Sequence, residues 1–142
     1  MTDDLEIFVD AQEDDYPDAL GEIRAGKKTS HWIWYVFPQL RGLGRSARSE
    51  LFGIEGAAEA QAYLSHPVLG PRLVEISTAL RDHKGITAQQ ILGEVDAKKV
   101  QSSMTLFAAQ PGADPIFAEV LATFYDGQPC GLTTEMLAAE AR

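Results

Sequence analysis

The sequence predicts a single all-α domain, an irregular bundle of about eight short helices. The first observation is a stripe of apolar residues that recur every three or four positions, as on one face of a helix: Leu69, Leu73, Ile76 and Leu80. The second is the alternation of helix-capping residues with Gly or Pro stops along the chain. The third is the length of 142 residues, typical of one domain, so we expect residues 1–142 to fold together.

The first helices are predicted from acidic starts and a glycine stop. An acidic N-terminal helix is expected over residues 3–15. A second helix is expected to follow it directly, with Pro17 near its first turn, where a missing N–H costs nothing, and with Gly26 at its end.

Ser30 is the expected N-cap of a short helix that Pro38 ends. Residues 33–37 also fit a buried strand, because β-branched and aromatic side chains dominate them. We favour the helix, since the rest of the chain offers little for a strand to pair with.

The remaining helices are predicted in the same way, from capping residues at their starts and Gly or Pro at their ends. Helices are expected at residues 46–52, 57–65, 67–80 and 87–93, then from Asp96 and from Asp114, and last over residues 133–142. Thr133 or Thr134 is the expected cap of this last helix, which we expect to be peripheral.

Composition excludes several classes of function. A net charge of −9 is unfavourable for general nucleic-acid binding, which depends on bases that neutralise phosphates. No apolar run approaches the roughly 20 residues that a membrane helix needs. The first four residues lack the positive start of a secretory signal, so we expect a cytoplasmic protein without a membrane partner. We expect no metal and no cofactor, because His31, His66 and His83 have no second ligand at a known spacing.

Cys130 is the only cysteine, so an internal disulfide is not possible. It lies between Pro129 and Gly131, in a stretch that is typical of a loop. Because the neighbouring sequence supplies no base or cation that would activate a thiol, we interpret Cys130 as an incidental loop residue.

Charge is distributed unevenly around an aromatic segment, Ser30–Gln39, which holds both tryptophans, His31 and two further aromatic residues. Residues 1–18 contain eight acids and no base, whereas residues 24–49 contain six bases and no acid. Either the acidic start pairs with the basic stretch across the fold, which we favour, or the basic stretch presents an anion-binding surface. The aromatic segment itself is either a dense part of the core or the wall of a pocket.

A glycine turn follows the aromatic segment. Residues 42–47, Gly-Leu-Gly-Arg-Ser-Ala, match the pattern of a dinucleotide-binding loop, but no strand leads directly into them and no parallel sheet is predicted. A weaker hypothesis is that the turn, with Arg41, Arg45 and Arg48 nearby, holds an anion. The alternative is a flexible loop with solvated arginines, which we favour.

Two further positions place polar groups among apolar ones. The run Ser102–Thr105 lies inside a predicted helix, where hydroxyl groups either bond back to the helix or make a polar contact with the aromatic segment. His31 stands beside Trp32, where it is either a structural residue or a general acid or base.

The combination of these segments is similar to a known family. The chain contains Ser-His-Trp-Ile-Trp at residues 30–34, Phe-Pro-Gln at 37–39, Gly-Leu-Gly at 42–44, Tyr-Leu-Ser-His-Pro-Val-Leu-Gly at 63–70 and Ser-Ser-Met-Thr-Leu-Phe at 102–107. It resembles the bacterial domain-of-unknown-function family 1810, some of whose members carry the label calpastatin. The resemblance implies a small, mainly helical cytosolic domain and supplies no catalytic residues. We expect these segments to converge in one cleft.

Three functions compete at this point. The leading one is the binding of a small anionic ligand, such as a nucleotide or a sugar phosphate. One tryptophan would stack on it, the arginines would meet its charge, and His31 and Gln39 would donate or accept hydrogen bonds. The candidate ligand-binding residues are Trp32, Trp34, Gln39, Arg41, Arg45 and Ser103. The second candidate function is an enzyme that hydrolyses an ADP-ribose-like or other phosphate-containing molecule, with His31 as acid and base. The third is a protein-interaction domain without a small-molecule site.

Overall fold

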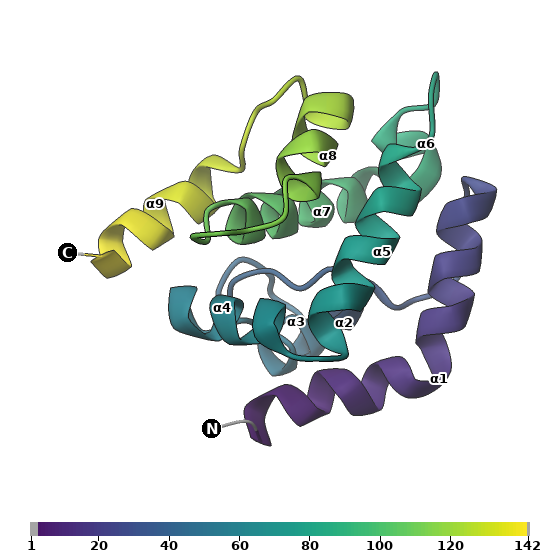
Figure 1. Ribbon diagram of the computed structural model, residues 1–142. Coiled ribbons are helices and arrows are strands. Elements are labelled where there is room, and N and C mark those ends of the chain that lie inside the picture. Colours follow the sequence, from purple (N-terminus) through teal and green to yellow (C-terminus); the bar gives the residue numbers. More distant parts are fainter. Residues whose placement is uncertain (1–2, 142) are drawn as a thin grey trace.

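The computed structural model describes residues 3–141, which form one all-α domain as predicted (Figure 1). The described part of the chain contains nine helices: α1 (Asp3–Ala25), α2 (Ile33–Val36), α3 (Ala47–Leu51), α4 (Ala57–Ser65), α5 (Leu69–Arg81), α6 (Ala88–Leu92), α7 (Glu94–Ala108), α8 (Ile116–Tyr125) and α9 (Gly131–Ala141). The aromatic segment is helical at α2, so the strand alternative is wrong.

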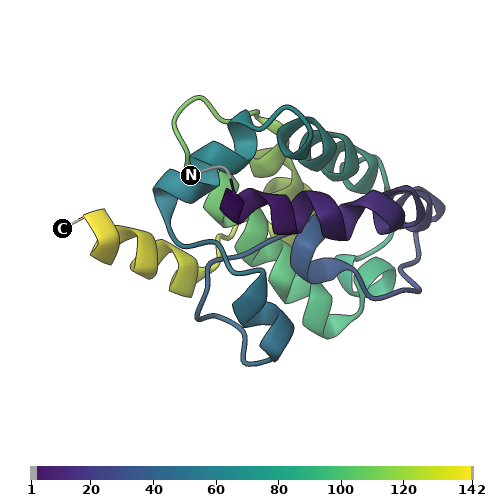
Figure 2. The same cartoon turned by 90° about the horizontal axis from the view of Figure 1, so that it is seen from below.

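The two predicted N-terminal helices are one continuous helix, α1, with Pro17 inside it. Proline cannot donate a backbone hydrogen bond and its ring crowds the preceding turn, which bends a helix without necessarily ending it. Figure 1 accordingly shows α1 turning sharply between two arms. The expected boundary at residue 15 is therefore a bend rather than an end. Seen from below, α1 lies across the molecule between α5 and α2 (Figure 2).

Ser30 is not the N-cap of α2, because the Glu22 carboxylate organises this segment instead. Trp32 occupies the cap position and makes no side-chain cap hydrogen bond. Glu22 Oε1 accepts hydrogen bonds from the backbone N–H groups of Thr29 and Ser30, at 2.8 and 2.9 Å, and from Trp32 Nε1 at 3.0 Å. The Ser30 hydroxyl donates to the other carboxylate oxygen. One side chain on α1 thus holds the entry to α2.

Helix α7 forms the centre of the core. Its residues 102–107 are all buried, and the helix packs against α4, α6, α8 and α9. A helix surrounded in this way has buried side chains on every face, so its hydroxyl groups need partners inside the protein. The Ser102 and Thr105 hydroxyls bond back to the carbonyls of Lys98 and Gln101, as one of the two alternatives for this run predicted.

The last helix begins two residues earlier than predicted, at Gly131 rather than at Thr133. The backbone N–H of Thr134 donates to the Cys130 carbonyl, which makes Cys130 the residue at the helix entrance. Although α9 projects from the body of the molecule (Figure 1), its far end is attached, because Glu140 Oε1 accepts a hydrogen bond from the Ala57 N–H at the start of α4.

The expected pairing of the acidic start with the basic stretch is wrong for the residues whose side chains are described. Lys28 instead pairs with Asp96 at 2.8 Å, and Arg41 pairs with Glu55. No helix within residues 3–141 is both long enough and apolar enough to cross a membrane.

Glu22 is expected to make stability depend on pH. Burial raises its pKa, but hydrogen bonds from Ser30, Thr29 and Trp32 lower it by more, to about 2. Since the pKa of Glu22 in the folded protein lies below its ordinary value of 4.5, the stabilisation is complete above that pH and is lost as the pH falls towards 2. Urea unfolding should show Glu22→Gln less stable by about 1–2 kcal/mol at pH 7. The difference in free energy of unfolding between the variant and the wild type should vanish near pH 2. A difference that does not change with pH would contradict this role of Glu22.

Gly70 is expected to tolerate no side chain, because a Cβ atom there would lie 2.1 Å from the Leu64 carbonyl oxygen. Gly70→Ala should therefore lower the free energy of unfolding by about 1–3 kcal/mol, as overpacking typically does. Gly21 is the matched control: it lies inside α1 with nothing within 4 Å of its virtual Cβ. Gly21→Ala should raise stability by about 0.5–1 kcal/mol. Equal effects of the two substitutions in thermal unfolding would contradict this packing.

Candidate functional site

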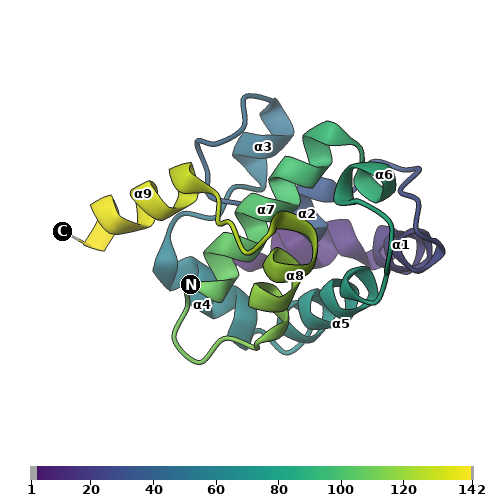
Figure 3. The ribbon, with the colours of Figure 1, turned by 90° about the horizontal axis from the view of Figure 1, so that it is seen from above.

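A groove of about 730 Å³ lies between the loop after α2, the first half of α7 and the start of α9. Figure 3 looks onto α7 with α3 and α9 flanking it. We call it the α7–α9 groove; it is lined by Gln39, Leu43, Gly44, Glu94, Val95, Lys98, Lys99, Gln101, Ser102, Pro129, Cys130, Gly131, Leu132 and Glu135. A crevice of about 10 Å³ beside Trp34 adjoins it, with Gln39 and Lys99 lining both spaces.

Trp34 holds two cations at the edge of the groove. The guanidinium carbon of Arg48 lies 4.9 Å from the centre of the Trp34 ring, and Lys99 Nζ lies 5.3 Å from it. Among the residues described, Arg48 and Lys98 form no ion pair, and Lys99 reaches Asp96 only at 3.9 Å. Attraction to the indole face places these cations without neutralising their charge.

Gln39 supplies a directional polar group in the same place. Its backbone carbonyl accepts from the Ile54 N–H at 2.9 Å, which fixes the loop, while its side-chain amide bonds to no residue within the described part of the chain. The adjacent Gly44 has no room for a side chain, since a Cβ atom would lie 2.2 Å from Ser49 Oγ. The glycine turn therefore packs closely on α3 and leaves the Gln39 amide available to a ligand.

Cys130 lies on the opposite wall, at the entrance to α9. Burial raises the pKa of its thiol, but hydrogen bonding from Ser102 and Thr133 and from the backbone N–H groups of Thr133 and Leu132 lowers the pKa by more, to below its ordinary value. Backbone N–H groups at the first turn of a helix stabilise an anion in this way. The sequence-based interpretation of Cys130 as an incidental loop residue missed this, because it placed the helix start two residues too late.

Helix α7 also fixes the position of Cys130. The Cys130 N–H donates to Thr105 Oγ1 at 2.8 Å, and Gln101 Nε2 donates to the Gln128 carbonyl at 2.9 Å. Among the described residues, the Ser102 and Thr105 hydroxyls thus bond within α7 and to the segment before α9 and form no hydrogen bond to the aromatic segment. The other alternative for Ser102–Thr105, a polar contact with the aromatic segment, is therefore wrong for these two hydroxyls.

The predicted site residues are distributed over three environments. Trp34 and Gln39 lie at the groove. Trp32 and Ser103 are fully buried, with Ser103 Oγ lacking a hydrogen-bond partner among the residues described. His31, Arg41 and Arg45 are exposed and do not line the groove. Arg41 lies over a separate hollow, where it pairs with Glu55 and donates to the Glu50 carbonyl.

The expected convergence of the sequence segments is therefore partial. The groove brings together the aromatic segment, the glycine turn and the Ser102 turn of α7, but residues 63–70 lie elsewhere: Leu64 and Gly70 line a different hollow, beside α8. Lys98, Lys99 and Cys130 were not among the predicted site residues. The signal for the two lysines was available, since they lie one turn before Ser102 on the same predicted helix.

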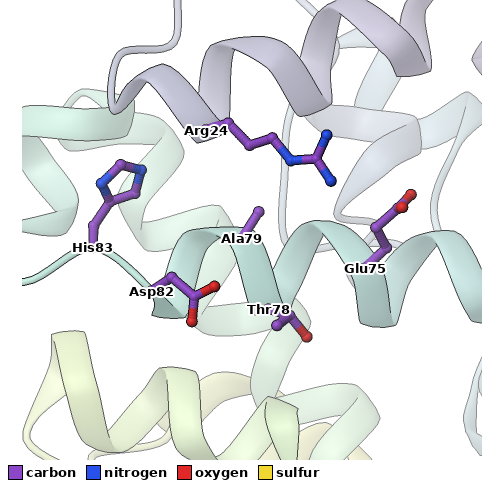
Figure 4. A pocket seen from close by; sticks show the side chains of 6 residues that line it. All are labelled: Arg24, Glu75, Thr78, Ala79, Asp82 and His83. Carbon is purple, nitrogen blue, oxygen red and sulfur yellow. The ribbon is translucent and has the colours of Figure 1, made fainter.

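A second concave region, of about 360 Å³, lies between α1 and α5 and is shown in Figure 4. Arg24 faces it from α1, while Glu75 faces it from α5 and Asp82 from the C-cap of α5. His83, at its end, has Nε2 2.5 Å from the Ile23 carbonyl and therefore serves to join the two helices. Its lining holds two acids, Glu75 and Asp82, against one base, Arg24, so it has a weaker claim to an anionic ligand than the α7–α9 groove. No cluster of three or more His, Cys, Asp or Glu suited to a metal ion exists within residues 3–141.

Comparisons with known proteins agree on the fold and the family. The model of the family described as "Protein of unknown function (DUF1810)" matches residues 2–137. The chain is similar to the crystal structure of the conserved hypothetical protein Rv1873 from Mycobacterium tuberculosis. The identity is 45% over 95% of this chain and 96% of that one, with a TM-score of 0.93. No curated protein matches the chain. Since the family model covers nearly the whole sequence, the chain belongs to the DUF1810 family.

Proposed function

We propose that the α7–α9 groove binds a small anionic molecule, of the size and chemistry of a nucleotide or a sugar phosphate. The observation that carries the proposal is a pair of cations, Arg48 and Lys99, held over Trp34. Beside them lies the Gln39 side-chain amide, which has no hydrogen-bond partner among residues 3–141. Lys98 adds a third cation on the groove wall. The chain has a net charge of −9, yet Arg48 and Lys98 form no ion pair among the residues described, and the Lys99 pair with Asp96 is 3.9 Å long. These bases therefore form a local site for an anion.

The volume and the lining suit such a ligand. At about 730 Å³ the groove falls within the range of roughly 300–1,000 Å³ that small-molecule sites occupy. Its walls combine apolar side chains, such as Leu43 and Leu132, with a few polar groups that can fix an orientation. Glu94 and Glu135 also line it and would accept hydrogen bonds from ligand hydroxyls, as a sugar provides. This mixture favours a hydroxylated anion over a simple inorganic one.

In this proposal Trp34 has a different role from the stacking platform predicted from sequence. Its ring is already contacted by Arg48 and Lys99, so it positions charge rather than a ligand ring. Trp32 is 1% exposed and donates to Glu22, so it is structural. The hydrolase alternative with His31 has no support from the geometry, because His31 is exposed and lies outside the groove.

The two indole N–H groups give a direct test by NMR, because they lie in different environments. The Trp34 group has no hydrogen-bond acceptor within the described residues, whereas the Trp32 group donates to Glu22. Titration of ¹⁵N-labelled protein with ATP, ADP-ribose and ribose phosphate should shift the Trp34 signal saturably and leave the Trp32 signal unchanged. Adenosine, the uncharged probe, should shift neither. Added salt should weaken the effect.

Matched charge substitutions locate the binding. Lys99→Gln should weaken affinity about tenfold or more, which corresponds to the loss of one charge-assisted hydrogen bond. Lys84→Gln removes the same charge at an exposed position between α5 and α6 and should have no effect. If none of the charged probes moves the Trp34 signal, or if the two substitutions weaken binding equally, the proposed site is wrong.

A further inference from the structure

We propose that the ligand of the α7–α9 groove carries an apolar ring beside its charged group, as a nucleotide does and a sugar phosphate does not. Leu132 is the side chain that contacts this ring. The inference rests on the proposed function, because it takes the anion site at Lys98 and Lys99 as given. It goes further by naming the class of ligand and a residue that selects it.

The first support is the place where exposed apolar side chains gather. Four large apolar side chains are exposed in the described part of the chain: Leu51, Ile86, Val95 and Leu132. The two most exposed, Val95 at 68% and Leu132 at 63%, both line the α7–α9 groove. A single exposed leucine is ordinary on a protein surface, but apolar side chains on the wall of a concave region are typical of a ligand site.

The end of the groove at Leu132 has apolar side chains on two walls. Leu43 lines it from the glycine turn, while Pro129 and Leu132 line it from the entrance to α9. Met136 follows Leu132 by four residues and therefore lies on the same face of α9. The Cε of Met136 would be 3.8 Å from a Cβ atom on Gly42, so this face of α9 is turned toward the glycine turn. Leu132 is thus directed toward the wall that contains Leu43.

A ligand ring in this groove has to pack on aliphatic side chains. No aromatic residue within 3–141 lines the groove itself, and the Trp34 ring in the adjoining crevice is already contacted by two cations. Val95 is as exposed as Leu132, but it lies more than one turn before Gln101, where the segment containing Pro129 attaches to α7. Leu132 therefore has apolar neighbours on the groove wall that Val95 lacks, which favours Leu132 as the contact for the ring.

The attachment of the α9 entrance to α7 sets the separation between the two parts of the ligand. Gln101 Nε2 donates to the Gln128 carbonyl at 2.9 Å, and the Cys130 N–H donates to Thr105 Oγ1 at 2.8 Å. The entrance to α9 therefore lies beside the part of α7 that follows Lys98 by about one to two turns, each of which rises about 5.4 Å. Figure 3 shows this start of α9 beside α7. A phosphate at the lysines and a ring on the α9 wall are thus separated by about the length of a sugar.

Two ligands that differ only in the ring test the inference. Adenosine monophosphate and ribose 5-phosphate share the sugar and the phosphate, and only the first carries a base. The indole N–H signal of Trp34 in ¹⁵N-labelled protein gives the affinity for each. We expect adenosine monophosphate to bind about tenfold more tightly or better, because burial of a leucine side chain contributes about that factor. Leu132→Ser should reduce its affinity nearly to that of ribose 5-phosphate, whose own affinity should not change.

Leu51→Ser is the matched control. Leu51 is 56% exposed, close to the value for Leu132, but it lines a separate hollow beside Arg41. This substitution should change neither affinity. Val95→Ser should weaken the binding of adenosine monophosphate less than Leu132→Ser does. Since all three side chains are exposed, thermal unfolding should show that the three variants fold as the wild type does.

The inference is overturned if the wild type binds the two ligands equally, and in that case the anion site stands without a ring contact. It is also overturned if Leu132→Ser weakens both ligands equally, or if Val95→Ser has the larger effect on adenosine monophosphate. A wild-type Trp34 signal that responds to neither ligand would instead contradict the proposed function itself. The two failures are therefore distinguishable in one set of titrations.

Discussion

The burial of α7 is the constraint on which the rest of the structure depends. Six consecutive residues, 102–107, are enclosed, and α4, α6, α8 and α9 pack against this helix. A helix in that position contributes apolar side chains to every side of the core, and its serines and threonines need hydrogen-bond partners there. Ser103 is the exception, since its Oγ has no partner among the residues described. Thr105 meets this requirement by accepting from the Cys130 N–H, and Ser102 does so through the Lys98 carbonyl. The polar face of the central helix therefore determines where α9 begins.

The exposed beginning of α7 is fixed by a second set of contacts. Lys28 pairs with Asp96 while its side chain is only 7% exposed, and its Nζ lies 4.9 Å from the centre of the Trp32 ring. Partial burial makes the loss of either partner costly, because the other would remain charged in a region of low dielectric constant. Together with the Glu22 hydrogen bonds, this ion pair holds the aromatic segment against α7. Trp34 consequently lies beside Lys99, and the groove has a defined wall.

Local sequence signals predicted most of the fold. The helices expected to begin at residues 46 and 87 and the apolar stripe of α5 lie where the capping and periodicity rules placed them, and the structure adds a capping box between Thr87 and Gln90. The errors have a common cause in competition between local signals and tertiary contacts. Serine is a residue type that commonly caps helices, but the N–H and the hydroxyl of Ser30 donate to the carboxylate of Glu22, eight positions away, instead. Threonine is another such residue type, but Thr133 is buried, and the helix begins at Gly131.

The candidate site was predictable only in part, for the same reason. Trp34 and Gln39 were available from the sequence because they lie within one short segment. Arg41 was predicted to lie near these residues, but it pairs with Glu55 instead. The cation that contacts Trp34 is Lys99, more than fifty positions away in the sequence. Cys130 comes to the groove through hydrogen bonds to α7, which no local pattern encodes.

The most direct test of the proposed anion site is a crystal structure of the protein with the tightest-binding phosphorylated compound. We expect a phosphate or carboxylate oxygen about 2.7–2.9 Å from Lys99 Nζ, as in charge-assisted hydrogen bonds, with the ligand also contacting the Gln39 amide. Density for the ligand in the hollow between Arg24 and His83, with the α7–α9 groove empty, would contradict it.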